Sequence, residues 1–255
     1  MPHHKQLIFL LIWPLVAMVL SFVFNAHQIV SQILFLGVPA LILAALEPRA
    51  ALKALIFGLV FVPLWLFVEH VMQTTGQWHA ISIFPERFLG SIAYDAITWF
   101  LLAQLYIVMF WEYFFESHKR IKVWQRRMTP LIATLSIFLV ITIVLLLWAP
   151  KFLQIPYFYL LLTIIVFILP LVMELKAHPN LLPKFLKVSA YFIYAFTVYE
   201  VTAIALGQWY YPSTQFIGWV ELFGQRFPFE EFVSWILIGS MTCLAWYEHF
   251  DDDEH

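Results

Sequence analysis

Long apolar runs separated by short polar breaks fill the chain from residue 7 to residue 247. Each run is long enough to cross the roughly 30 Å hydrocarbon core of a bilayer as an α-helix. The pattern therefore predicts an all-α integral membrane protein with eight transmembrane helices. We place these helices at residues 7–24, 29–46, 51–70, 88–111, 130–149, 155–173, 185–206 and 229–247.

A short motif occurs twice among these runs: an acid near the end of a run, followed seven residues later by Gly-Gln-Trp. The first copy contains Glu69 and Trp78, and the second contains Glu200 and Trp209, so one constant offset relates the two copies. Four spans per copy is an even number, so both copies share one orientation. We therefore expect two parallel four-helix repeats, residues 1–128 and 129–255, related by an axis along the membrane normal.

Composition supports the membrane assignment, because 63% of the residues are hydrophobic and only 12% are charged, about half the usual charged fraction. Disulfides are not expected, since Cys243 is the only cysteine. No Lys/Arg cluster alternates with aromatic residues as a nucleic-acid surface requires, so we expect no nucleic-acid partner. The partner that composition does predict is the lipid bilayer.

The basic residues predict the orientation of the chain. Loops on the same side as the N-terminus contain 11 of the 14 Lys and Arg residues, five of them between residues 119 and 127. Cytoplasmic loops are enriched in Lys and Arg, so both termini are predicted to lie in the cytoplasm. The expected location is the cell inner membrane, crossed several times.

Carboxylates from both copies are predicted to gather at the outer leaflet. Glu69 and Glu200 lie at the outer ends of the third and seventh runs. Asp95, Glu230 and Glu231 lie in the first turns of the fourth and eighth runs, at the same leaflet. Ionisable residues within spans are costly and are functional candidates for that reason. The alternative is that these acids lie among lipid headgroups and only cap helices.

The second copy carries a more specific pattern, Phe227-Pro228-Phe229-Glu230-Glu231-Phe232, preceded by Gly207-Gln208-Trp209-Tyr210-Tyr211. This pattern resembles the membrane lycopene cyclase domain family, the heterodimeric or tandem-fused type, which uses two such domains. The resemblance covers roughly residues 29–115 and 155–250. The first copy departs from the family, because Ala93-Tyr94-Asp95-Ala96 stands where Pro-x-Glu-Glu is expected and only one carboxylate remains.

The resemblance implies an enzyme of carotenoid biosynthesis that cyclises the linear end groups of lycopene, or of a related linear carotene, to ionone rings. A general acid protonates the terminal double bond, the next double bond attacks the cation, and a base removes a proton. The catalytic candidates are Glu230, Glu231, Asp95, Glu200 and Glu69. The sequence leaves open whether Glu230 or Glu231 is the initiating acid.

Aromatic residues near these acids are candidates for binding the substrate and stabilising its cation through their ring faces. They are Trp78, Trp99, Trp209, Tyr210, Tyr211 and Trp235. The alternative for each is the aromatic belt found at membrane interfaces. No cofactor and no metal are expected, since the chain lacks a dinucleotide fingerprint, an i,i+4 His pair and a Glu-x-x-His motif.

Three other functions are compatible with the same sequence. A transporter built from parallel repeats also has duplicated prolines and acids within its spans. An inactive carotene-binding or assembly module would explain the reduced motif of the first copy. A carotenoid hydratase would quench the same cation with water. The resemblance also allows contacts with other membrane enzymes of the carotenoid pathway.

Overall fold

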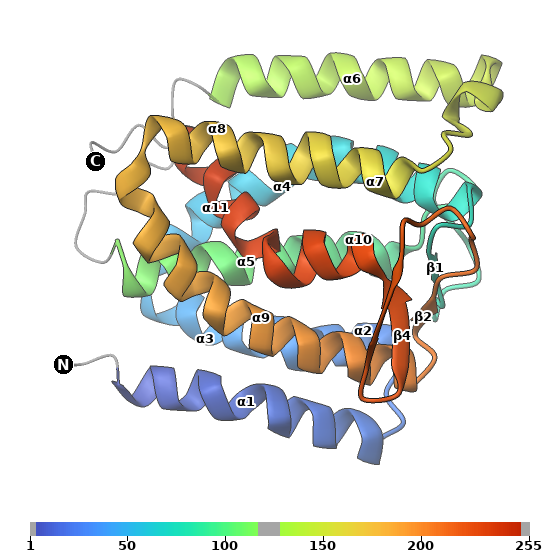
Figure 1. Cartoon of the computed structure of the whole chain (residues 1–255). Coiled ribbons are helices and arrows are strands. Elements are labelled where there is room, and N and C mark those ends of the chain that lie inside the picture. The colour runs from blue at the N-terminus through green and yellow to red at the C-terminus, as the bar shows by residue number, and fades with distance from the viewer. Residues whose placement is uncertain (1–3, 117–127, 251–255) are drawn as a thin grey trace.

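The computed structural model describes residues 4–116 and 128–250. The basic run between residues 119 and 127, which the sequence interpretation uses, lies outside these ranges. Within the described residues the chain is mostly helical, and seven helices are long and apolar enough to cross a membrane. An all-α, multi-pass membrane protein is therefore confirmed at this coarse level (Figure 1).

The first part of the chain contains four helical runs. They are α1 (His4–Val23); α2 (Gln28–Gln32), the π-helix η1 (Ile33–Gly37) and α3 (Val38–Leu46); α4 (Pro48–Thr74); and α5 (Tyr94–Phe114). Only the short strand β1 (His79–Ala80) lies between α4 and α5. The predicted start of the fourth span at residue 88 is wrong, because Phe88 and Ile92 form an isolated bridge and the helix begins at Tyr94.

The second part follows the same order of elements. Its helical runs are α6 (Met128–Trp148) with the 3₁₀ turn η2 (Pro150–Leu153); α7 (Phe158–Leu162), the π-helix η3 (Thr163–Ile168) and α8 (Leu169–Ala177); the 3₁₀ turn η4 (Pro179–Leu181) with α9 (Leu182–Ala205); and α10 (Phe229–Glu231), the π-helix η5 (Phe232–Leu237) and α11 (Gly239–Phe250). The strands are β2 (Trp209–Tyr210), β3 (Trp219–Leu222) and β4 (Gln225–Pro228). The last run departs from a single helix at Ile238, where φ is −115°.

Two local features explain the shape of the runs. The π-helices η1 and η3 end two residues before Pro39 and Pro170. Proline lacks the N–H that continues an α-helical ladder, so the turn before it widens into a π-bulge. Gly76 and Gly207 then end α4 and α9 with φ of +69° and +66°, a conformation that glycine adopts without steric cost.

The elements form one bundle with a looped end and an opposite end. In Figure 1, α5 and the α10–α11 run occupy the middle, while α1 and α6 lie on opposite flanks. These flanking helices are the least buried, and their exposed residues are mostly apolar. Such surfaces suit contact with lipid tails. All four strands lie at the looped end, whereas α1 begins and α11 ends at the opposite end.

A polar cluster is buried at the end opposite the strands. Lys53 forms a 3.5 Å ion pair with Glu112, and the Tyr247 hydroxyl donates to the same carboxylate. Trp111 donates its indole N–H to Glu248 at 2.7 Å. Buried charges require such partners, and this cluster ties α4, α5 and α11 together.

Candidate functional site

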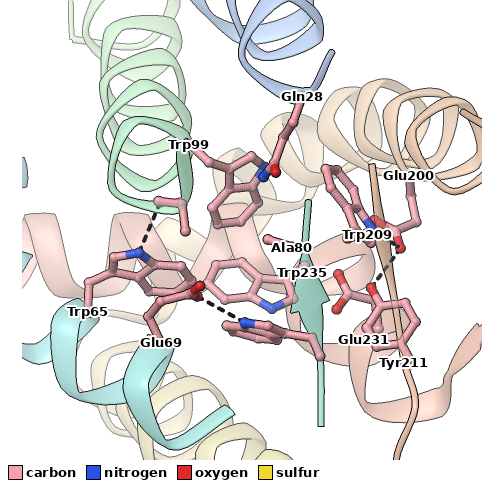
Figure 2. Close-up of a pocket in the computed structure, with 12 residues that line it drawn as sticks. Gln28, Trp65, Glu69, Ala80, Trp99, Glu200, Trp209, Tyr211, Glu231 and Trp235 are labelled. Carbon is pink, nitrogen blue, oxygen red and sulfur yellow. Dashed lines mark hydrogen bonds between the residues drawn. The ribbon is translucent and has the colours of Figure 1, made fainter. Parts of the chain in front are cut away.

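A cavity lies at the looped end of the bundle, beside β1 and β2 (Figure 2). Its free volume is about 60 Å³. Three carboxylates line it: Glu69 from α4, Glu200 from α9 and Glu231 from α10. Most of the remaining wall consists of aromatic side chains, namely Trp65, Trp78, Trp99, Trp209, Tyr211 and Trp235. Acids from distant parts of the chain therefore meet in one aromatic chamber.

The two copies of the repeated motif place an acid and a tryptophan in the same way. Trp78 donates its indole N–H to Glu69 at 2.9 Å, and Trp209 donates to Glu200 at 3.1 Å. In each copy the glycine turn after the helix reverses the direction of the chain. The tryptophan that follows the turn then lies over the acid, which is located about one turn before the end of the helix. The spacing between the acid and the glycine is thus what positions this hydrogen bond.

Pairing between the strands brings the two motifs together. β1 and β2 are antiparallel, with His79 opposite Tyr210 and Ala80 opposite Trp209. His79 follows Trp78 directly and Tyr210 follows Trp209 directly, so these two residues occupy equivalent positions in the two copies. Each motif therefore pairs with its own equivalent, and this contact closes the cavity on the loop side.

Glu231 is the acid that differs most from the others in its surroundings. It lies in the first turn of α10, is buried, and accepts a hydrogen bond from the Tyr159 hydroxyl. The backbone N–H of Tyr159 donates to the Gln77 side chain at 2.6 Å. The loop after α4 thus fixes the start of α7, and α7 in turn orients the Glu231 carboxylate.

Asp95 and Glu230, both catalytic candidates from the sequence, do not line this cavity. Asp95 accepts hydrogen bonds from the Ser82 hydroxyl at 3.1 Å and the Ile83 N–H at 3.3 Å. Glu230 accepts from the Ile217 N–H at 2.8 Å. Both side chains hold the loop that precedes their helix. Neighbouring residues on a helix point about 100° apart, so Glu230 faces this loop while Glu231 faces the cavity.

Tyr210 is also excluded from the cavity. Its side chain is 47% exposed and lies against the His79 ring, with 5.1 Å between centroids. Successive residues of a strand point to opposite sides, and Trp209 and Tyr211 take the inward positions. Tyr210 therefore lies outside this cavity, whereas the other five aromatic candidates all line it.

Three residues at the site were missed by the sequence analysis: Trp65, Tyr159 and Gln28. Trp65 stacks on Trp78 and Trp99, with centroids 5.8 and 5.6 Å apart, and donates its N–H to the Ala96 carbonyl at 3.0 Å. Gln28 lines the cavity, and the offset of the repeated motif places it at the position equivalent to Tyr159. The repeat was therefore a signal that could have found this pair.

Tyr211 donates its hydroxyl proton to Glu200 at 2.8 Å. Burial, and then the nearby carboxylates of Glu200 and Glu231, raise the pKa of Tyr211 well above its ordinary value. The phenol therefore remains a neutral donor at any physiological pH. Figure 2 shows Tyr211, Glu200 and Glu231 together on one side of the cavity, with Glu69 and Trp65 on the other.

The arrangement suits proton transfer to an apolar ligand. Carboxyl groups provide transferable protons, and the surrounding ring faces favour a positive charge. Within residues 4–116 and 128–250, no group of three or more His, Cys, Asp or Glu side chains is arranged to hold a metal ion.

Comparison with protein-family models, curated proteins and solved structures finds no match for this chain.

Proposed function

We propose that the protein is a membrane enzyme that cyclises the linear end groups of lycopene, or of a related linear carotene, without redox chemistry. One observation carries the proposal: three buried carboxylates and six aromatic side chains line a single cavity. A carotene end group has no polar atoms, so an apolar chamber with few polar groups can hold it. The same chamber provides a proton and stabilises the cation that protonation creates.

In this mechanism Glu231, rather than Glu230, is the initiating acid. Its carboxyl group protonates the terminal double bond of the bound end group. The electrons of the next double bond then close the ring and move the positive charge to a ring carbon. A carboxylate removes a neighbouring proton to restore an alkene, and Glu200 is best placed because it lies beside Glu231 (Figure 2). Proton gain and proton loss balance, so no external oxidant or reductant is consumed.

Tyr159 and Tyr211 act as positioning residues in this scheme. Tyr159 holds Glu231 and Tyr211 holds Glu200, so each acid is directed toward the cavity by a neutral donor. The tryptophan rings provide the remaining wall against which the cation forms. Well-placed dipoles and ring faces contribute most in a site that excludes water.

The proposal also includes eight spans arranged as two parallel four-helix repeats, with the α10–α11 run as the eighth. Matching positions of η1 and η3, matching glycine ends of α4 and α9, and the pairing of β1 with its equivalent β2 all support this arrangement. The distribution of Lys and Arg supports cytoplasmic termini. The cavity then lies near the outer leaflet, where the end of a carotene spanning the bilayer would lie.

Expression in a lycopene-accumulating host, followed by pigment analysis, tests the proposal. We expect cyclic carotenes with the wild type, none with Glu231→Gln, and near wild-type amounts with Glu230→Gln. The two variants are matched, since each replaces one of two adjacent glutamates and keeps an acceptor oxygen. Unchanged lycopene with a well-expressed wild type would reject the function. Activity lost only in Glu230→Gln would move the acid to that residue.

A further inference from the structure

A second cavity adjoins the first. It lies among α4, α5, the α7–α8 run, α9 and the α10–α11 run, and its free volume is about 80 Å³. The two cavities share three walls, the side chains of Trp65, Trp99 and Trp235. Among the described residues, none of those that line the second cavity is charged. We call it the apolar cavity, and the first the acid cavity.

Two residues that line the apolar cavity have larger counterparts at the equivalent positions of the other copy. Val68 and Val166 line it. By the offset of the repeated motif, the residues at the equivalent positions of the other copy are Tyr199 and Phe35. Their rings stack on each other with centroids 4.8 Å apart and are buried. Two valines therefore leave space where two aromatic rings fill the equivalent place.

We propose that the apolar cavity binds the linear polyene of the carotene whose end group lies at Glu231; this inference rests on the proposed function. A conjugated hydrocarbon chain has no hydrogen-bonding groups, so a cavity without charged side chains, lined mostly by rings and aliphatic groups, suits it. Because the acid cavity lies directly behind the shared tryptophans, a chain bound here would have its end group next to the acids. On the other side of the bundle, Phe35 and Tyr199 fill the equivalent path.

The cavity volumes show that binding must be accompanied by movement. A cavity of about 150 Å³ holds a molecule as small as benzene, whereas the two cavities here provide about 60 and 80 Å³. Trp65, Trp99 and Trp235 separate the two spaces, so their rotation is the change that joins them. Because the path lies on one side, each binding event presents one end group, and a bicyclic product requires two events.

Val166→Phe tests the path, because it introduces into the apolar cavity the phenylalanine that the other copy has at the equivalent position, Phe35. We expect it to lower turnover of full-length lycopene at least about tenfold, since overpacking here is costly. A truncated analogue, which keeps the acyclic end group and only the first conjugated double bonds, should react as in the wild type. Val172→Phe is the matched control, because Val172 is exposed on α8 and should affect neither substrate.

These outcomes separate the inference from the proposed function. If the wild type cyclises neither substrate, the proposed function fails. If Val166→Phe cyclises both substrates at wild-type rates, the function stands and the polyene site is wrong. If Val166→Phe slows both substrates equally although Val172→Phe slows neither, the substitution acts on the acid cavity and the inference is also wrong.

A labelling experiment tests occupancy without requiring turnover. Cys243 is the only cysteine of the chain and lines the apolar cavity. We expect lycopene to slow the reaction of Cys243 with N-ethylmaleimide several-fold in purified, detergent-solubilised protein. The control carries Cys243→Ser and Ile141→Cys, a site exposed on α6, and its labelling should not respond to lycopene. Equal labelling of Cys243 with and without lycopene would overturn the proposed polyene site.

Discussion

The two walls of the acid cavity share a scaffold but differ in their chemistry. Both walls place a glutamate under a tryptophan indole, Glu69 under Trp78 and Glu200 under Trp209. The wall from the second copy adds Glu231. Counting from the extended cap residues before α5 and α10, Ala93 and Pro228, the position equivalent to Glu231 is Ala96, which also lines the cavity.

A second difference accompanies the first. Tyr159, which holds Glu231, has Gln28 at its equivalent position. The acid and its tyrosine are thus present together on one wall and absent together from the other. The repeated motif explains why acids converge on one chamber, whereas the differences between its copies favour Glu231 as the initiating acid of the proposed reaction. The walls therefore make one composite site rather than two independent sites.

The largest effect is expected from making the second wall like the first. Glu231→Ala removes the proposed initiating acid, and such losses commonly lower rates by about 10²–10⁴. The reciprocal change, Ala96→Glu, should not rescue Glu231→Ala, because no tyrosine stands at Gln28 to hold the new acid. Conversion of lycopene by membranes with equal amounts of each variant measures this. Full rescue would show that the walls are interchangeable and would contradict the composite site.

A smaller difference is expected between the two glutamates that both walls share. Glu200→Gln should lower cyclisation about a hundredfold, because it removes the carboxylate beside Glu231 that accepts the final proton. Glu69→Gln should lower it only a few-fold, since Glu69 lies on the opposite wall and is held by Gln73 and Trp78. Initial rates at saturating lycopene compare the two variants directly. Equal losses would assign both walls the same role.

Tyr211→Phe should have a smaller effect than Glu200→Gln, about tenfold, corresponding to one hydrogen bond to a charged group. Burial, and then the charges of Glu200 and Glu231, raise the pKa of Tyr211 well above its ordinary value. The phenol is therefore protonated throughout the physiological pH range, and the ratio of wild-type to variant rates should stay constant across it. A ratio that changes with pH would show that Tyr211 itself transfers a proton.

The smallest effect is expected from Asp95→Asn. Asn keeps one acceptor oxygen for the loop contacts to Ser82 and Ile83, so we expect a stability loss of about 1 kcal/mol. Thermal unfolding in detergent measures that loss, and pigment extracts measure the products. The amounts of monocyclic and bicyclic carotenes should fall together. Their fall should be no larger than the fall in the amount of folded protein. Selective accumulation of a monocyclic carotene would support a separate site around Asp95.

The sequence predicted the helical runs and part of the site because two independent signals were strong. Apolar runs of membrane length are distinctive, and the repeated motif located Glu69, Glu200 and their tryptophans together. The start of the fourth span was predicted less well. The first turn of this helix depends on the loop contacts of Asp95 with Ser82 and Ile83, which connect positions that the hydrophobic pattern does not relate.

Other site residues could not be recognised from the pattern alone. Trp65 and Tyr159 lie inside apolar runs, where a cavity-facing aromatic residue looks the same as one that packs in the core. Tyr210 was included because adjacent residues were treated as equivalent, although strand alternation places it outside. Glu230 and Glu231 could not be separated without the register of α10, which is set by its extended cap at Pro228.

Solvent deuterium provides the most direct test of proton-initiated cyclisation in this cavity. Purified protein incubated with lycopene in D₂O should yield cyclic carotene that carries one deuterium for every ring formed, because the carboxyl proton exchanges with solvent before transfer. Glu231→Gln should yield no labelled product. Mass spectrometry of the extracted pigment measures both results. Cyclic product without deuterium, or a product that has gained the elements of water instead of a ring, would contradict the account.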